Sequence, residues 1–413
     1  MKASPVHHLD AVERITLKLL QYCMKSNWAG YDPYDGLNSQ LFQSLRLLNS
    51  KWTRLALMQG VKRSPVNLRP LLLVPKSHNA KGLALFLSAL VKLLRARVIE
   101  EENEPNRVAD LLLEQRTRGT AYFCWGYSFD WQTRTELVPR GSPNVICTTF
   151  AANALLDAYE SRGRSQYCEA ALKAARFVLE QLYCSDGEAF ACFNYTLLER
   201  TQIHNANLLA AAFLCRASNS TGEEEFLIPA LKAARFSAAK QNKDGSWYYG
   251  ERERPSQKWI DNFHTGFNLC ALRSIGRFAH TNEFEPNVIR GLDYYRSNFF
   301  EPDGAPRYFH DRKYPLDIHS AAQSVITLLA LNDLNPGNIN LAYKVLCWTI
   351  EHMWDERGYF YYQQDRFWKN CIPYLRWGQA WMLLALAAFL ETTLNASSRM
   401  ATVFESAGMQ ARI

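Results

Sequence analysis

The sequence predicts an all-α fold, a closed ring of six helical hairpins or (α/α)6 toroid, and two observations support this prediction. The seven residues Ala-Leu-Lys-Ala-Ala-Arg-Phe occur twice, at 171–177 and 230–236, each time followed by an Asp-Gly turn and an aromatic residue. A repeat of about sixty residues containing two helices and a turn is typical of stacked helical hairpins. Glycines that mark such turns recur at spacings of 61, 58, 59 and 54 residues: Gly126, Gly187, Gly245, Gly304 and Gly358.

Amphipathic segments supply the helices of this ring in chain order. Apolar residues recur with helical spacing over about 8–26, and a loop at 28–36 rich in Gly, Pro, Asp and aromatic residues ends that helix. We expect outer helices at 8–26, 107–116, 165–182, 225–241, 286–299 and 340–353. We expect inner helices at 79–95, 145–160, 204–216, 262–279, 318–331 and 377–392. One toroid domain should cover residues 1–396, and a polar, flexible tail should follow over 397–413.

Composition and charge exclude several classes of protein. Of the 413 residues, 48% are apolar and 21% are charged, which is the usual balance of a soluble globular domain. The net charge is +7, and Lys and Arg are scattered rather than run together, so we expect no nucleic-acid partner. The longest apolar run, 380–390, is too short to cross a bilayer, so no transmembrane segment is predicted. Residues 1–10 lack the apolar core of a signal peptide.

The ten cysteines indicate a reducing compartment. Most of them lie inside apolar helical segments, and no two form a Cys-x-x-Cys pair. We therefore expect buried thiols rather than disulfides, and a cytoplasmic protein. Because no matched set of Cys and His ligands stands at the rim described next, we predict neither a metal site nor a cofactor.

Polar residues gather where the inner helices are expected to begin, on one rim of the ring. The interval from the turn glycine is 17 residues to His204, 19 to His264, 15 to His319 and 18 to Arg376. Aspartates precede two of these helices, at Asp261 and at Asp317. Such aspartates can simply cap the helices, but three histidines in matching positions favour a functional rim. Helix N-termini and an arginine would also suit an anionic group of a ligand.

The loops that lead to this rim are rich in aromatic residues. The segment 127–134 is the richest, because it supplies a phenol, a carboxylate, an amide and a guanidinium within one short loop. Aromatic rings interleaved with Asp, Arg, Gln and Asn suit a sugar, since rings stack on its C–H face and polar groups bind its hydroxyls. The alternative is that these rings fill the centre of the toroid as ordinary core.

The chain resembles the α/α-toroid enzymes over nearly its whole length. Gln241-Asn-Lys-Asp-Gly-Ser-Trp247 is similar to the QW repeat of terpenoid cyclases, but their Asp-x-Asp-Asp motif is absent. The six hairpins and the polar, aromatic rim resemble six-hairpin glycosidases, toroid polysaccharide lyases, glucuronyl C5-epimerases and bacterial proteins encoded with exopolysaccharide genes. This resemblance implies a carbohydrate-active enzyme of polysaccharide biosynthesis. No catalytic signature of these families is complete here, so no family residue is carried over.

Our leading hypothesis is a lyase or C5-epimerase whose partner is an acidic, uronate-containing poly- or oligosaccharide. Such chemistry needs a group that neutralises the carboxylate and a base with a pKa near the working pH. The catalytic candidates are His204, His264, His319, Tyr127, Tyr249, Tyr308, Asp130, Asp261 and Asp317. The candidates for substrate binding are Asp32, Trp125, Arg134, Asn205, Trp247, Gln323, Arg376 and Gln379.

Two other functions remain open from the sequence. A glycoside hydrolase would use two carboxylates, drawn from Asp130, Asp261, Asp317 and Asp32, at a separation that sets its stereochemistry. A non-catalytic glycan-binding toroid would bind a saccharide without turnover. The sequence does not predict the oligomeric state.

Overall fold

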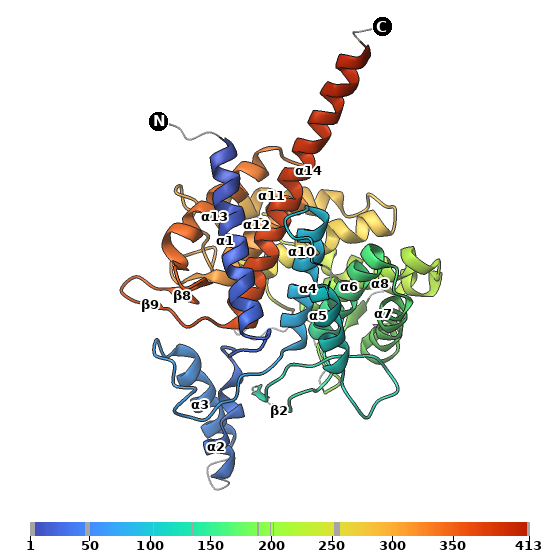
Figure 1. Cartoon of the computed structure of the whole chain (residues 1–413). Coiled ribbons are helices and arrows are strands. Elements are labelled where there is room, and N and C mark those ends of the chain that lie inside the picture. Colours follow the sequence, from blue (N-terminus) through green and yellow to red (C-terminus); the bar gives the residue numbers. More distant parts are fainter. Residues whose placement is uncertain are drawn as a thin grey trace.

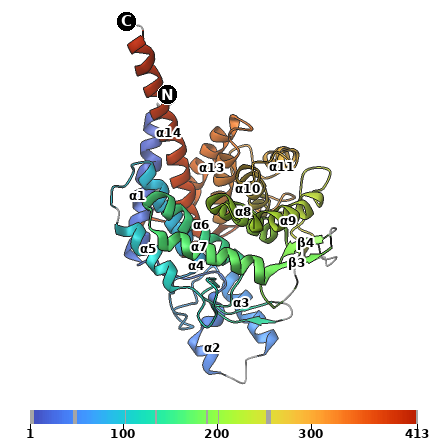
Figure 2. The ribbon, with the colours of Figure 1, turned by 90° about the vertical axis from the view of Figure 1, so that its right-hand side faces the viewer.

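The structure confirms the closed ring of helical hairpins. The computed structural model describes residues 5–45, 50–101, 103–133, 136–187, 190–198, 200, 202–251 and 257–410. Most of them form helices, which are arranged around a common centre (Figures 1 and 2). The inner helices are α4 (Ala80–Arg95), α6 (Val145–Arg162), α8 (His204–Thr221), α10 (Asn262–Phe278), α12 (Ile318–Ala330) and α14 (Trp381–Gln410).

Each inner helix packs on the next, and α14 packs back on α4, so the inner ring is closed. Each also packs against one outer helix. In the order of the inner helices, these partners are α5 (Asn103–Glu114), α7 (Ser165–Phe177), α9 (Leu227–Ala239), α11 (Glu285–Asn298), α13 (Gly337–Met353) and α1 (Pro5–Lys25). The first and last helices of the chain thus form one hairpin of the ring, and Figure 1 shows them side by side. These twelve helices match the predicted (α/α)6 toroid.

The repeated heptapeptide places small residues between the two layers of helices. In α7 its three buried alanines are Ala171, Ala174 and Ala175, and in α9 they are Ala230, Ala233 and Ala234. Small side chains let the backbone of an outer helix come close to the inner helix that it covers. α7 then continues as a π-helical turn, η3 (Val178–Leu182), which explains the longer outer helix predicted there.

Four of the five predicted turn glycines have the left-handed backbone that favours glycine. Gly187, Gly245, Gly304 and Gly358 have φ values of +61°, +95°, +97° and +99°. Gly126 was wrongly placed in this set. It forms a β-bridge with Pro143, where a Cβ atom would lie 2.2 Å from the Ser142 carbonyl oxygen, so close backbone approach is what requires glycine there.

Short antiparallel strands brace the loops between helices. They pair as β1 (Trp131–Gln132) with β2 (Leu137–Val138), β3 (Tyr183–Asp186) with β4 (Phe190–Phe193), β6 (Trp354–Asp355) with β7 (Tyr359–Phe360), and β5 (Leu316–Asp317) with β8 (Gln363–Gln364) and β9 (Lys369–Asn370). In the last sheet Asp317 is opposite Gln363, and β9 pairs with the other side of β8.

The chain between α1 and α4 leaves the ring. It contains a 3-10 helix, η1 (Asp35–Asn38), followed by the helices α2 (Gln40–Ser44) and α3 (Lys51–Arg63). The two helices α2 and α3 form a lobe at the lower end of the molecule in Figure 1. We call residues 40–76 the lobe. Buried Arg69 ties it to the ring: its guanidinium pairs with Asp35 at 2.6 Å and donates to the Tyr374 hydroxyl at 2.8 Å.

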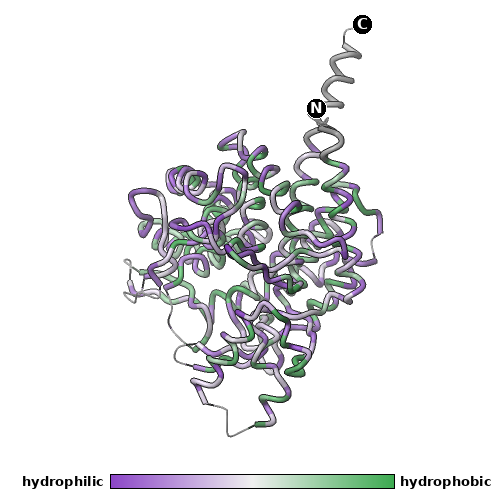
Figure 3. Tube along the Cα trace, turned by 90° about the vertical axis from the view of Figure 1, so that its left-hand side faces the viewer, coloured by the Kyte–Doolittle hydropathy of each residue, from purple (hydrophilic) through white to green (hydrophobic). Residues whose placement is uncertain are grey.

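The last helix is longer than expected. We expected the last inner helix to end near residue 392, but α14 continues to Gln410. The physical reason is that the stretch 381–407 contains neither proline nor glycine, the residues that most often end a helix. Among the helices of the described residues, none is both long and apolar enough to span a membrane. Figure 3 shows hydrophobic and hydrophilic residues mixed along the helices, as expected of amphipathic segments.

Candidate functional site

A cavity of about 520 Å³ lies where the inner helices begin. Its size is typical of a pocket for a small organic ligand. The second residue of every inner helix lines it, counting the π-helical turn η6 (Leu375–Ala380) as the start of the last one. These six residues are Lys81, Ile146, Asn205, Phe263, His319 and Arg376. Equivalent positions of six helices with equivalent orientations point toward the same centre, so this ring of residues forms the floor of the site.

Four of these helices begin at a polar cap. The side chains of Asn79, Asn144, Asp261 and Asp317 each accept a hydrogen bond from a backbone N–H in the first turn of their helix. This arrangement satisfies donors that otherwise lack partners and fixes where each helix starts. The caps therefore determine which residue stands second and reaches the cavity.

His264 and Asp261 form a hydrogen-bonded pair at the edge of the cavity. The imidazole Nδ1 lies 2.6 Å from Asp261 Oδ2, and Asp261 Oδ1 accepts the backbone N–H of His264 at 2.9 Å. Trp259 Nε1 also donates to Asp261 Oδ2, at 2.8 Å. Because a carboxylate only accepts, this contact places a proton on Nδ1 and leaves Nε2 as the ring nitrogen that can act on a ligand.

His319 lies nearby but has no such partner. Its ring stacks on Phe263 and on Trp381, with centroids 4.4 and 4.5 Å apart, and it is 1% exposed. Neither ring nitrogen has a hydrogen-bond partner within the described part of the chain. Burial, together with the positive charges of Lys81 and Arg376, lowers the pKa of His319 well below its usual value. His319 is therefore a neutral imidazole whose polar atoms are left for a ligand.

Lys81 brings a buried amine to the same cavity. Its Nζ lies over the rings of Phe150, Trp381 and Phe267, at 4.6, 5.1 and 5.4 Å from their centroids. It forms no ion pair with a carboxylate of the described residues. Burial, and then the charge of Arg376, lowers the pKa of Lys81 to about 7. A desolvated cation without a counter-ion is well suited to bind an anionic group of a ligand.

Arg376, in contrast, already has a partner. Asp32 holds it through two hydrogen bonds, from Nε to Oδ2 at 2.5 Å and from Nη2 to Oδ1 at 2.8 Å, and both side chains are buried. The guanidinium also lies 5.3 Å from the centre of the Tyr127 ring. Asp32 was predicted to bind substrate, but the structure places it behind Arg376, where it positions the guanidinium instead.

Aromatic side chains form the walls of the cavity. Tyr249 stacks on Trp259 at 4.4 Å, and the Tyr127 hydroxyl lies 3.0 Å from the Tyr195 hydroxyl. Tyr127, Tyr249 and Tyr308 all line the cavity, as do Phe129, Trp131 and Phe309. Burial raises the pKa of Tyr127, Tyr249 and Tyr308 above the ordinary value of a tyrosine. The pKa values of Tyr249 and Tyr308 are raised well above it. A phenolate base is therefore disfavoured at neutral pH, and the tyrosines are better suited to hydrogen bonding and stacking.

His204 does not reach the cavity, although its interval from the turn glycine matches that of the other histidines. Its Nδ1 lies 3.0 Å from Ser237 Oγ and its Nε2 lies 2.9 Å from Glu251 Oε1, and it is 1% exposed. His204 is the first residue of its helix, whereas His319 is the second and His264 the third. A helix turns by about 100° per residue, so these positions point in different directions. Asn205, not His204, faces the cavity, and its Oδ1 has no partner among the described side chains and backbone.

Two tryptophans predicted to bind substrate are structural. Trp125 Nε1 donates to the Leu112 carbonyl at 2.8 Å, and Trp247 Nε1 donates to the Ser237 carbonyl at 2.9 Å, with both rings buried. In the QW-like segment, Gln241 Nε2 donates to the Asn287 carbonyl at 2.9 Å. This motif therefore ties an outer helix to the next hairpin, and none of its residues lines the cavity.

Four further predicted residues do not line the cavity, and the fold engages at least one polar atom of each. Asp317 is fully buried and accepts from Trp377 Nε1 at 3.0 Å; burial raises its pKa to about 6. Gln379 makes two hydrogen bonds to the backbone of Phe360, and Asp130 accepts the Arg140 backbone N–H. Gln323 lies deeper along α12, where its Nε2 donates to Thr327. Arg134 lies outside the described residues.

Several residues of the site were missed in the sequence. Lys81 is the most important of them, and it stands two residues after the cap Asn79, just as His319 stands two after Asp317. A comparison of all six inner-helix starts, including the start of α4, would have found Lys81. The same comparison would have found Ile146 and Phe263, which stand two residues after the caps Asn144 and Asp261. The remaining lining residues had no such signal: Tyr34, Lys62, Tyr195, Trp259, Phe267 and Trp377.

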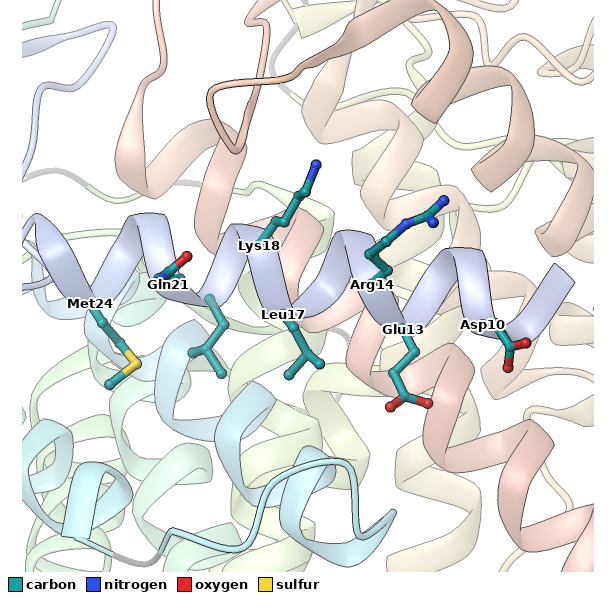
Figure 4. A pocket seen from close by; sticks show the side chains of 8 residues that line it. Asp10, Glu13, Arg14, Leu17, Lys18, Gln21 and Met24 are labelled. Atoms are coloured by element: carbon teal, nitrogen blue, oxygen red, sulfur yellow. The ribbon is translucent and has the colours of Figure 1, made fainter. Parts of the chain in front are cut away.

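A second hollow, of about 540 Å³, lies along α1 on the outside of the ring. All of its lining residues belong to this one helix. Figure 4 shows Arg14 and Lys18 pointing to one side of the helix and Glu13 and Leu17 to the other. Because these groups do not converge, the hollow is not a candidate active site.

Solved structures with the same fold support this description. No protein-family model and no curated protein matches the sequence. An unsaturated glucuronyl hydrolase specific for heparin aligns with a TM-score of 0.62 and 12% identity, over 93% of this chain and 97% of its own. A cellobiose 2-epimerase from Bacillus thermoamylovorans aligns with a TM-score of 0.60 and 11% identity, over 77% and 88%. A family 76 glycoside hydrolase (mannosidase) from Bacteroides thetaiotaomicron aligns with a TM-score of 0.54 and 16% identity, over 77% and 88%. The chain thus shares the six-hairpin (α/α)6 toroid fold of these proteins.

Proposed function

We propose that this protein is a carbohydrate epimerase that moves a proton at the carbon next to the carboxylate of an acidic saccharide. The observation that carries the proposal is the Asp261–His264 pair, set in the same cavity as the unpaired amine of Lys81. An oriented imidazole and a desolvated cation are the two groups that this chemistry needs.

The reaction begins with binding of the carboxylate to Lys81, near the guanidinium of Arg376. His264 Nε2 then takes the proton from the neighbouring carbon, and Asp261 stabilises the imidazolium that forms. The electron pair left on carbon delocalises into the carboxylate, where the Lys81 cation stabilises the added negative charge. Return of a proton to the opposite face of that carbon gives the epimer.

His319 is the second group that can handle the proton. It is neutral in the empty cavity, but an anionic substrate next to it would raise its affinity for a proton. His264 and His319 both contact the ring of Phe263, with centroids 4.2 and 4.4 Å away. Two imidazoles next to one bound sugar could serve the two faces of the reacting carbon.

Other proteins of this fold are consistent with the proposal. A cellobiose 2-epimerase and a D-mannose isomerase, which aligns with a TM-score of 0.57 at 13% identity, are named for rearrangements of sugars. The glucuronyl hydrolase is named for an acidic sugar. A hydrolase mechanism with two aspartates has less support in this chain, because Asp261 is the one candidate aspartate among the described cavity-lining residues, and His264 and Trp259 already engage it.

The test is incubation with uronate-containing oligosaccharides in heavy water, followed by mass spectrometry and ultraviolet absorbance. We expect one deuteron to be incorporated at the carbon next to the carboxylate, without cleavage, and we expect much slower incorporation with His264→Gln. Cleavage with a new ultraviolet-absorbing product would assign the same proton abstraction to a lyase instead. Cleavage without deuterium or absorbance would overturn the proposal in favour of a hydrolase.

A further inference from the structure

The lobe differs from the rest of the molecule in its charge. Residues 40–76 contain seven Lys and Arg and no Asp or Glu, and no acidic residue occurs between Asp35 and Glu100. The whole chain has 47 basic and 40 acidic residues, so removing the lobe leaves 40 of each. The entire net charge of +7 therefore resides in the lobe, contrary to our expectation that basic residues are scattered.

The lobe also exposes apolar side chains. Fourteen large hydrophobic residues are exposed in the described part of the chain, and six of them are in the lobe. Trp52 and Leu71 are each 75% exposed. The others are Leu41, Leu45, Val66 and Leu73. They come from α2, from α3 and from the irregular segment 64–76, so the apolar surface is built from three separate pieces of chain.

The hairpin β8–β9 contacts the lobe and also exposes large apolar side chains. Asn370 Nδ2, in β9, donates to the Ser64 carbonyl of the lobe at 3.0 Å. The turn of the hairpin exposes Phe367 by 83% and Trp368 by 40%. A hairpin from a distant part of the sequence thus carries an exposed aromatic pair and is hydrogen-bonded to the lobe.

We propose that the lobe docks on an anionic lipid bilayer. Exposed Trp and Leu side chains among basic residues, without acidic ones, are typical of proteins that lie in the membrane interface. Mainly aliphatic side chains favour lipid over nucleic acid, because leucine and valine insert into hydrocarbon but do not stack on bases as aromatic rings do. Exposed Arg63 and Lys76 carry the charge that phospholipid headgroups would attract, and Lys51 lies 5.5 Å from the Trp52 ring.

Docking would also place the active site beside the membrane. Lys62 of α3 lines the cavity and donates to the hydroxyl of Tyr34, which lines it too. The lobe is thus a wall of the cavity as well as the proposed membrane contact. The proposal does not rest on the function proposed above, since it concerns a surface outside the cavity.

The test is sedimentation of the full-length protein with vesicles of phosphatidylcholine, with and without phosphatidylserine. We expect binding only to the vesicles that contain phosphatidylserine, and weaker binding as salt is raised. The combined change Lys51→Gln, Arg63→Gln and Lys76→Gln should weaken binding on the order of 100-fold, since each basic residue near a charged membrane contributes about 1 kcal/mol.

A second variant tests the apolar part. A triple variant should abolish vesicle binding: Trp52→Ser, Leu71→Ser and Leu73→Ser. The matched control carries Ile228→Ser and Ile289→Ser, at exposed positions of α9 and α11, and should bind vesicles like the wild type. Circular dichroism of each variant checks the fold. Absence of wild-type binding to anionic vesicles would overturn the proposal, and so would equal loss in the matched control. Self-association that depends on the lobe, without vesicle binding, would assign the surface to a second copy of the chain and also overturn it.

Discussion

The two sides of the cavity hold their charged groups in different ways. On the side of α10 and α12, Asp261 is hydrogen-bonded to His264 and His319 has no hydrogen-bond partner among the described residues. On the side of α4 and η6, Arg376 is hydrogen-bonded to Asp32, whereas Lys81 Nζ lies over aromatic rings and forms no ion pair with a carboxylate of the described residues. Each side thus combines one oriented group with one that is left for a ligand. The difference is chemical: one side can transfer protons and the other can bind an anion.

The largest expected effect of breaking this arrangement is on the proton-transfer side. His264→Gln keeps a polar side chain of similar length but removes the basic nitrogen, so turnover should fall by about 10²–10⁴-fold, the usual contribution of a general base. Substrate affinity should change little, because Lys81 and Arg376 remain. Steady-state kinetics on an acidic saccharide would measure both quantities, and nearly normal turnover would contradict the assignment of His264 as the base.

On the anion-binding side, Lys81→Met should weaken substrate binding and also slow turnover, because this cation stabilises the charge that the proposed reaction adds to the carboxylate. Methionine fills similar space between the aromatic rings but carries no charge, so the affinity for an acidic saccharide should fall by roughly 10- to 100-fold, as for loss of a charged hydrogen bond. Calorimetry with an acidic saccharide and its neutral counterpart would measure this change. Equal loss for both ligands would show that Lys81 does not recognise the acid group.

The pH dependence of binding should separate the two sides further. The pKa of Lys81 is lowered to about 7, so the cation is present below this pH and is lost above it. Affinity for an acidic ligand should therefore fall as the pH rises through about 7, by up to tenfold for each pH unit in the limit where the ligand binds only the cation. In the Lys81→Met variant this fall in affinity should disappear. The measurement is a series of binding titrations between about pH 6 and 9, at steps of about one pH unit. A wild-type affinity that does not change over this range would contradict a cation at this position.

The smallest expected effect on turnover is that of His204→Gln. This histidine is buried, hydrogen-bonded to Ser237 and Glu251, and outside the cavity. The substitution should lower the free energy of unfolding by about 1–3 kcal/mol through a lost buried hydrogen bond, while the folded fraction keeps its activity. Denaturant unfolding together with kinetics would test this, and a loss of turnover as large as that of His264→Gln would show that the two histidines act together.

Much of the fold could be predicted because local patterns specify it. The heptapeptide repeat, the turn glycines and the apolar spacing gave all twelve ring helices, most of them to within a few residues. The lobe could not be placed in this way because it interrupts the repeat. The residues that hold it in place are distant in sequence, as with Arg69, which bonds to Asp35 and Tyr374.

The candidate site was predicted in part. His264, His319, Asp261, Asn205, Arg376 and three tyrosines do lie at one cavity. Trp125, Trp247 and Gln379 were included because aromatic and amide side chains suit sugars, but backbone carbonyls and N–H groups inside the fold engage them instead. Composition identifies the kinds of residue near a rim and does not show which polar atoms the fold has already satisfied.

The sequence by itself determined the six hairpins and the caps Asp261 and Asp317 of two inner helices. Only the tertiary structure decided which side chain of each first turn faces the centre. The physical reason is the helical rotation of about 100° per residue: moving one position turns a histidine from the cavity, as with His319, to a buried contact with an outer helix, as with His204. The same packing placed Lys81 among aromatic rings, where desolvation lowers its pKa to about 7 and makes it the cation left for a ligand.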